Sequence, residues 1–402
     1  MKTKLIALLL AAAMLFSLVA CGETAADTGS STQTALAETE VSDAPEQSAE
    51  AEQSAQAEQP AETEEPAEAE DSAEEGFQPY TFVDDLGHEI EITEEITAIV
   101  PSGQLAQVIL LGIAPDLMVG LGGQLYDDMA EYIPDYDRLS QLTYFGTVLG
   151  AADLDVEALA STNAQLVIDM GYTKTGYEEE LATTQELTGI TCVFIEAGLD
   201  NYGEAIRKLG QLLGREEKAE EMATWCEEVY DRALGIMEQV GDNKVNGIYA
   251  LGDGGLNVIA ESQSQAEVIN LVFNNLAVIE NASGKGTGNT VNMEQIALWN
   301  PDFVIFGSDS VYDTAAEDPA WSQISAIANG KYVESPESPF NWTVAPPACQ
   351  RYLALLWLPS ILYPEYCDYD LQEEVTEYYE LFYGVTLTDE QYAALTANAF
   401  FK

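Results

Sequence analysis

The chain has 402 residues, of which 70 are acidic and 14 are lysine or arginine, so its formal net charge is −56 at pH 7. This excess argues against nucleic acid and anionic lipid as partners, because like charges repel, whereas a cationic ligand or a basic docking surface is compatible with it. Zinc and manganese sites usually use several imidazoles or thiolates, and the only histidine is His88. We therefore predict no metal site and no catalytic residue, and we expect His88 at the surface of a turn or strand.

Residues 1–20 have the pattern of a secretory leader. Two lysines precede an apolar run from Leu5 to Phe16, and that run is shorter than the roughly 20 residues of a membrane span. The following segment, Leu18-Val19-Ala20-Cys21, resembles the lipobox of bacterial lipoproteins. This resemblance implies that residues 1–20 are removed and that Cys21 carries lipid; the alternative is an ordinary signal peptide with an incidental cysteine. The fold is thus expected to be extracytoplasmic and lipid-anchored through Cys21.

Residues 21–77 are predicted to comprise the lipidated cysteine and an acidic stalk. From Gly22 to Gly76 the sequence has 17 acidic residues and no basic ones, and its only large apolar residues are Leu36 and Val41. So little apolar surface cannot form a core, and disorder is expected. The stalk is interpreted as a solvated tether.

From residue 78 onward, short apolar runs alternate with helical patterns, which is typical of helices packed on a mostly parallel sheet. The sequence predicts strands at 117–121, 166–170 and 191–195, and a helix over 104–111 that follows the segment Ile99–Gly103. These elements form a predicted first lobe over residues 78–213. The alternation resumes in a second lobe over 242–402, with strands at 245–251 and 303–307 and a helix over 265–276.

A long helix is predicted from Arg215 to Val240, because apolar residues recur there at every third or fourth position between two glycines. At 1.5 Å per residue this helix is about 39 Å long, enough to run beside two lobes and join them. We assign residues 214–241 to it. Four cysteines follow Cys21, at positions 192, 226, 349 and 367; buried thiols are expected, with a Cys349–Cys367 disulfide as the alternative.

The two halves share a helix–strand unit. In each unit a glutamate precedes the start of a strand by nine positions: Glu157 precedes Leu166, and Glu294 precedes Phe303. A glutamate near a helix start also simply favours the helix dipole, and chance similarity of two such units is the alternative explanation.

The order of these features resembles the class III solute-binding proteins of bacterial ABC importers, which serve iron–siderophore, haem, cobalamin and some metal or oxyanion systems. The resemblance covers about residues 80–395. It includes the opening Thr81–Ile90, the loop and helix Val100–Gly112, both helix–strand units, Asn300-Pro301-Asp302, the segment Phe340–Pro364 and the ending Glu380–Gly384. The first half departs from the family, since Asn163-Ala164-Gln165 replaces the usual Pro-Asp.

The resemblance implies an α/β fold of two lobes with mostly parallel sheets, joined by a long rigid helix, with a ligand cleft between the lobes. Ligands of open α/β sheets bind beyond the carboxyl ends of the strands. The expected ligand contacts are Ser102, Gln104, Tyr172, Trp342 and Arg351. Trp342 has the alternative of packing within its loop, and Arg351 that of pairing with an acid on its own helix.

The resemblance also implies that Glu157 and Glu294 dock into arginine pockets of a permease dimer. We therefore expect a monomeric, non-enzymatic receptor that needs no cofactor and captures an iron complex of the siderophore or haem type. A corrinoid or a molybdate-like oxyanion is the alternative ligand within this fold. A surface hydrolase or an adhesin is the alternative of another class, although no G-x-S-x-G or H-E-x-x-H motif is present.

Overall fold

The computed structural model describes residues 77–148, 154–173, 176–284 and 286–401. The predicted leader, Cys21 and nearly all of the stalk lie outside these residues. Contacts divide the chain into two units, Met1–Ser72 and Ala73–Lys402, and everything described here belongs to the second unit. In the described part, none of the helices combines the length and apolar character that a membrane crossing requires.

The first lobe is built on a three-stranded parallel sheet, in the order β3-β6-β7. The strands are β3 (Ile99–Pro101), β6 (Leu166–Gly171) and β7 (Thr191–Glu196). All residues of β3 and β6 are buried, as expected for strands that are covered on both faces. The register pairs Ile99 with Leu166, and Leu166 with Thr191. The predicted strands at 166–170 and 191–195 are therefore confirmed.

Short elements complete this lobe. Helix α1 (Gln104–Ile113) follows β3, and β4 (Gly120–Leu121) pairs in parallel with β5 (Thr143–Tyr144). The strand predicted over 117–121 is thus shorter, because a 3₁₀ helix occupies Pro115–Leu117. The remaining helices are α2 (Tyr136–Leu139), α3 (Val156–Ser161), α4 (Tyr177–Thr188) and α5 (Tyr202–Leu213).

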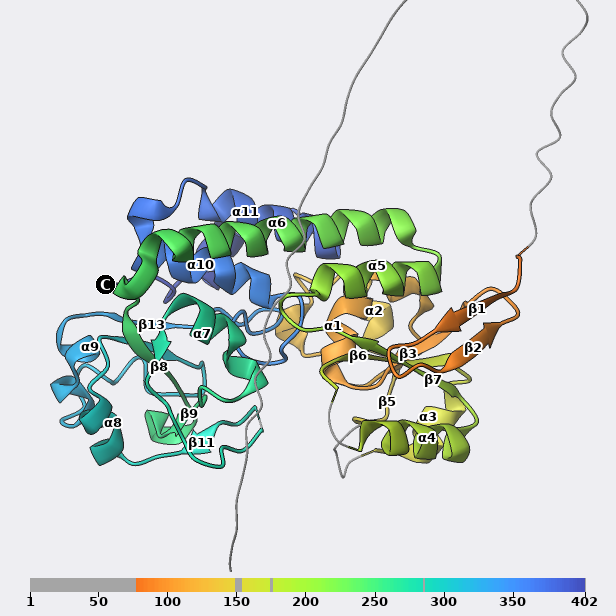
Figure 1. Ribbon diagram of the computed structural model, residues 1–402, viewed down its shortest axis with the longest axis horizontal. Coiled ribbons are helices and arrows are strands. Elements are labelled where there is room, and N and C mark those ends of the chain that lie inside the picture. Colours follow the sequence, from red (N-terminus) through yellow and green to blue (C-terminus); the bar gives the residue numbers. More distant parts are fainter. Residues whose placement is uncertain (1–76, 149–153, 174–175, 285, 402) are drawn as a thin grey trace, which may run out of the picture. The chain divides into compact units, whose positions relative to one another are not determined.

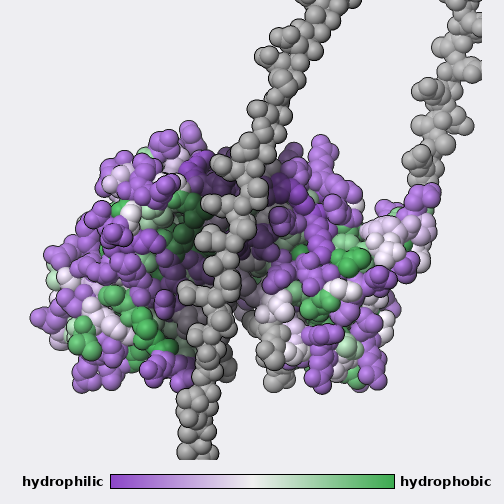
Figure 2. Space-filling view, viewed as in Figure 1, coloured by the Kyte–Doolittle hydropathy of each residue, from purple (hydrophilic) through white to green (hydrophobic). Residues whose placement is uncertain are grey.

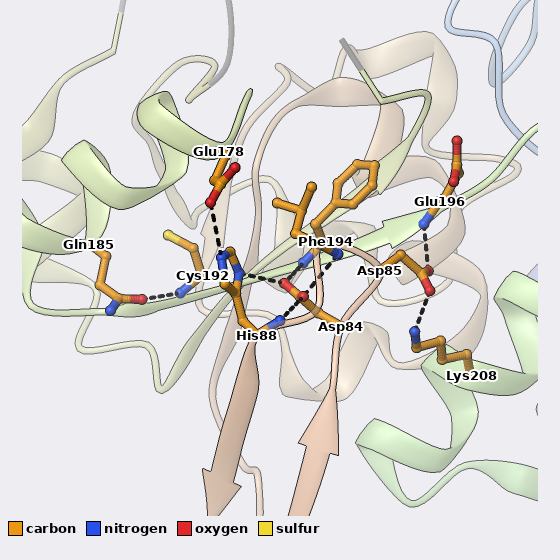
Figure 3. Close-up of polar contacts among 10 residues, drawn as sticks. Asp84, Asp85, His88, Glu178, Gln185, Cys192, Phe194, Glu196 and Lys208 are labelled. Carbon is orange, nitrogen blue, oxygen red and sulfur yellow. Dashed lines mark hydrogen bonds and ion pairs between the residues drawn. The ribbon is translucent and has the colours of Figure 1, made fainter. Parts of the chain in front are cut away.

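An N-terminal hairpin, β1 (Tyr80–Val83) and β2 (Glu89–Ile92), closes the free edge of β7. N–H groups on this edge donate to side chains instead of to another strand (Figure 3). The acceptors are Asp84 Oδ2 at 3.3 Å from Phe194 N, Asp85 Oδ2 at 2.8 Å from Glu196 N, and Gln185 Oε1 at 3.1 Å from Cys192 N. The hairpin turn therefore protects an edge that would otherwise present unpaired backbone groups.

The long helix α6 spans Glu216–Val240 and confirms the predicted helix to within one residue at its start. Gly214, with φ +63°, ends α5 and lets the chain reverse into α6. Helix α6 packs against α5 of the first lobe and against α7 and α10 of the second. In Figure 1 it runs past both sheets, as the joining role requires.

The second lobe has a mostly parallel sheet, in the order β11-β9-β8-β12-β13, with β10 also pairing with β8. Its strands are β8 (Asn246–Leu251), β9 (Asn257–Val258), β10 (Asn274–Asn275), β11 (Asn289–Thr290), β12 (Phe303–Phe306) and β13 (Tyr332–Glu334). The predicted helix over 265–276 is too long at its end. It is a 3₁₀ turn at Ser264–Ala266 followed by α7 (Glu267–Val272), because Asn274 and Asn275 pair with β8.

The second-lobe helices after β11 are α8 (Met293–Trp299), α9 (Ser325–Ala328), α10 (Arg351–Leu362), α11 (Leu371–Tyr383) and α12 (Asp389–Leu395). Further 3₁₀ helices lie at Asp127–Met129, Gly241–Asn243, Asp253–Gly255, Trp321–Gln323 and Pro364–Tyr366. Helix α10 is apolar on nearly all sides and packs against α6, α7 and α11, whereas α11 also contacts α1 of the first lobe. The C-terminal helices therefore connect the two lobes as α6 does.

The main hydrophobic core runs from the first lobe through α6 and α10 into the second. The visible face is mostly hydrophilic, with separate hydrophobic areas on each lobe (Figure 2), in keeping with the acidic composition. Cys192, Cys226, Cys349 and Cys367 are free thiols, so the alternative of a Cys349–Cys367 disulfide is not formed.

Candidate functional site

The carboxyl ends of the parallel strands carry several of the residues expected to contact ligand. Ser102 follows β3 directly but is buried, and its hydroxyl donates to Asp169 Oδ1 on the neighbouring strand β6. Gln104 is exposed and is the first residue of α1. Of these two, Gln104 is the side chain that a ligand can reach directly.

Gln107, which the sequence pattern did not single out, shapes the loop beside Gln104. Its amide oxygen accepts from the backbone N–H groups of Gly122 and Gly123 at 3.0 and 2.9 Å, and its amide nitrogen donates to the Gly123 carbonyl at 2.9 Å. A Cβ at Gly122 would lie 2.6 Å from the Gly103 Cα atom. The two loops therefore approach so closely that Gly122 cannot carry a side chain.

Three side chains form a hydrogen-bonded cluster that connects the lobes: Tyr172, Glu267 and Arg351. Tyr172 follows β6 in the first lobe, Glu267 begins α7 in the second, and Arg351 begins α10. The Arg351 guanidinium donates to the Tyr172 hydroxyl at 2.7 Å and to Glu267 Oε2 at 3.2 Å. The Tyr172 hydroxyl in turn donates to the same Glu267 oxygen. We call these three residues the inter-lobe triad.

The members of the inter-lobe triad differ in their access to solvent. The Arg351 side chain is 0% exposed, whereas that of Glu267 is 34% exposed. A buried cation at a helix N-terminus is unfavourable with respect to the helix dipole, so Arg351 depends on its partners. Burial, aided by the hydrogen bond and the charge of Glu267, raises the pKa of Tyr172 to about 12 against the lowering effect of Arg351. The phenol is therefore a protonated donor at neutral pH.

Arg351 does pair with an acid, as the alternative interpretation held, but that acid belongs to α7 and not to its own helix. Glu267 itself was not singled out from the sequence. Trp342 is fully buried and packs against Trp357 with ring centroids 6.4 Å apart and planes at 80°. In this structure its side chain thus presents no surface to a ligand.

A second group of charges near the lobe boundary is acidic. Glu337 is exposed as a residue, but partial desolvation of its carboxyl raises the pKa, with further contributions from Asp309 and Glu334 and from Asp128 of the first lobe. Glu337 lies in the loop after β13, and Asp309 lies three residues beyond β12. The negative charge of one lobe therefore acts on the other.

The two glutamates expected to dock occupy matching positions on short helices. In α3 and α8 the residue before the helix is an N-cap whose side chain accepts a backbone N–H, and the glutamate is the second helical residue. The caps are Asp155, which accepts from Ala158 N at 2.9 Å, and Asn292, which accepts from Gln295 N at 2.8 Å. Glu157 and Glu294 are both exposed.

The match between these helices extends beyond their caps. Leu159 and Ile296, two residues after each glutamate, are fully buried. Each helix is followed by an asparagine in the left-handed region, Asn163 with φ 54° and Asn300 with φ 42°. The two helices thus share their caps and their buried residue, and differ at their ends, where Thr162 separates α3 from Asn163 whereas Asn300 follows α8 directly.

The only histidine lies away from the inter-lobe triad. His88 Nδ1 is 3.1 Å from Asp84 Oδ2, and its Nε2 is 3.9 Å from Glu178 Oε1 (Figure 3). It lines a surface pocket of about 390 Å³ together with Cys192, and burial raises the pKa of that thiol to about 12. Within the described residues no three His, Cys, Asp or Glu side chains are arranged to hold a metal ion.

Comparisons with known proteins place this geometry among transport proteins. The family model described as periplasmic binding protein matches residues 127–339. The chain is similar to an ABC transporter solute binding protein from Sulfurospirillum deleyianum, with a TM-score of 0.72, 25% identity and coverage of 79% of this chain and 99% of that one. A structure of CeuE from Helicobacter pylori in a nickel–histidine complex matches with a TM-score of 0.58 and 17% identity over 79% of this chain and 99% of that one.

A local similarity at higher identity concerns another relative. The molybdate-binding protein MolA from Haemophilus influenzae is 33% identical over 97 residues, which are 23% of this chain and 27% of MolA. The match thus spans about a quarter of that relative.

Proposed function

Because this chain belongs to the periplasmic binding protein family and is a solute-binding protein of the ABC-transporter type, we propose that it captures an iron complex and delivers it to a membrane permease. The iron complex is of the siderophore or haem kind. The family and its structural neighbours are transport proteins and not enzymes. The protein acts outside the cytoplasm, held by lipid on Cys21.

The observation that carries this proposal is the inter-lobe triad. It joins the carboxyl end of a first-lobe strand to two second-lobe helices, which is where an open α/β fold binds its ligand. A ligand in contact with Tyr172 and Glu267 touches both lobes at once, so that binding and lobe position are coupled. Tyr172 adds a rigid aromatic face suited to a flat or bulky chelate, and Gln104 adds an exposed amide.

Docking onto the permease uses Glu157 and Glu294. The repeated capping and burial in α3 and α8 support an equivalent role for the two glutamates. Two equivalent carboxylates on two lobes suit a partner with two-fold symmetry that offers an arginine to each.

A second candidate ligand is a molybdate-like oxyanion, because MolA is 33% identical over its matched segment. A thermal-shift series separates the candidates, since a ligand at a hundredfold excess over Kd stabilises the fold by about 2.7 kcal/mol. The protein is screened against ferric siderophores, haem, corrinoids and molybdate. We expect a ferric siderophore or haem to raise the melting temperature most. A chain that none of these compounds stabilises would not be the proposed receptor.

A further inference from the structure

We infer that Glu267 determines the ligand class of the cleft: its carboxylate occupies the Arg351 guanidinium, so the site favours neutral or cationic metal complexes over oxyanions. This inference rests on the proposed function, because it names the charge of the ligand for the same site. It favours a neutral or cationic ferric siderophore over molybdate, and also over haem, because haem carries two anionic propionates.

The first argument is the order in which a ligand meets the inter-lobe triad. Arg351 has no exposed surface, whereas about a third of the Glu267 side chain is exposed. The guanidinium already donates to Tyr172, to Glu267 and to the Ser264 carbonyl at 3.3 Å. An incoming oxyanion therefore meets a carboxylate first, and reaches the two terminal nitrogens of Arg351 only by displacing a charge-assisted hydrogen bond. The third nitrogen, Nε, has no partner but is buried.

The second argument is that the described part of the chain offers no other arginine to an anion. The other four described arginines pair with carboxylates elsewhere: Arg138 with Asp135, Arg207 with Glu220 and Glu227, Arg215 with Asp116, and Arg232 with Glu374. Asp128, Asp309 and Glu337 add negative charge near the lobe boundary. Negative charge on both lobes disfavours a dianion at their boundary.

A cationic or neutral ligand is not repelled by these carboxylates. A cationic complex, or a neutral complex with N–H or O–H groups, can bind to the exposed face of Glu267 while the bond between Glu267 and Arg351 persists. The carboxylate accepts at more than one lone pair, so that Glu267 serves Arg351, Tyr172 and the ligand together.

The test removes the carboxylate charge and keeps its shape. Molybdate binding is measured by calorimetry in the wild-type protein and in Glu267→Gln, with Glu317→Gln as the matched control because Glu317 is an exposed second-lobe glutamate. We expect Glu267→Gln to bind molybdate at least about tenfold more tightly than the wild type, and Glu317→Gln to behave like the wild type. The gain should disappear in the double variant Glu267→Gln, Arg351→Gln.

Two results would overturn the inference: molybdate binding that is equally tight in the wild type and in Glu267→Gln, or no molybdate binding in either. Glu267→Ala, checked for folding by its melting temperature, takes the place of the glutamine variant if that variant does not fold. The receptor proposal is judged separately, by whether any chelate in the wild-type screen stabilises the fold. The two proposals therefore fail in distinguishable ways.

Discussion

At the scale of single residues, Arg351 shows what a sequence can and cannot indicate. An arginine in a segment typical of the iron-complex branch is a reasonable candidate for ligand contact, and the structure places it beside Tyr172 as expected. Its carboxylate partner, however, lies 84 residues away in the chain. No local spacing relates the two positions, because only the packing of α7 against α10 brings them together.

For Trp342 the sequence could not decide between ligand contact and core packing. An aromatic residue in a loop between polar residues is compatible with a ligand platform and with core packing alike. The choice depends on whether the loop folds inward, and here it does, because Trp342 packs against Trp357 of α10.

Glu337 gives a prediction about pH. Its pKa is raised above the ordinary value of 4.5, first by burial and then by neighbouring acids, so its ionised form costs folding free energy. That cost is absent below the unfolded pKa, grows as the pH rises from the unfolded to the folded pKa, and is complete above the folded pKa. Glu337→Gln should therefore raise the melting temperature at pH 7, by a small amount because solvent screens an exposed carboxylate, and change it little near pH 4. Equal shifts at both pH values would contradict the assignment.

At the scale of elements, periodicity predicted most of the regular structure, because long amphipathic helices and buried strands have strong local signals. Helix α6 and strands β6 and β7 are examples. The predicted helix over 265–276 failed at its end, where pairing of β10 with β8 overrides local helical preference. The side chains that accept the edge N–H groups of strand β7 could not be predicted from the sequence either, because Asp84 and Asp85 are distant from β7 in the chain.

The hydrogen bonds that Asp84 accepts should stabilise the fold. Asp84 is buried and accepts backbone N–H groups from Leu86, His88 and Phe194. Asp84→Ala leaves these donors without their acceptor, and we expect it to lower the free energy of unfolding by about 2 to 3 kcal/mol. Urea denaturation measures the change, with Glu89→Ala, an exposed position nearby, as the control. If Asp84→Ala lowers the free energy of unfolding no more than the control does, the hydrogen bonds of Asp84 do not stabilise the fold.

At the scale of the whole molecule, the chain is a solute-binding protein of two α/β lobes, for which we propose a ligand site between the lobes and a docking glutamate on each. The sequence predicted the two α/β sheets and the joining helix from alternation and length. It did not indicate that α10 and α11 return to contact α6 and α1, because such packing depends on which apolar faces meet in three dimensions.

Docking can be tested independently of ligand chemistry. In the double variant Glu157→Lys, Glu294→Lys, two repulsive contacts should replace two attractive ones at the permease, while the inter-lobe triad is untouched. We expect unchanged ligand affinity and loss of uptake in cells at equal surface abundance. A variant that supports normal uptake would return both glutamates to ordinary helix-start residues.

The ligand can be identified by native mass spectrometry of the protein purified from its host after growth at low iron concentration, combined with elemental analysis. We expect one bound ligand per chain, released on unfolding and containing iron. A bound compound without iron, such as molybdate or a corrinoid, would contradict the proposal that this protein is a receptor for an iron complex.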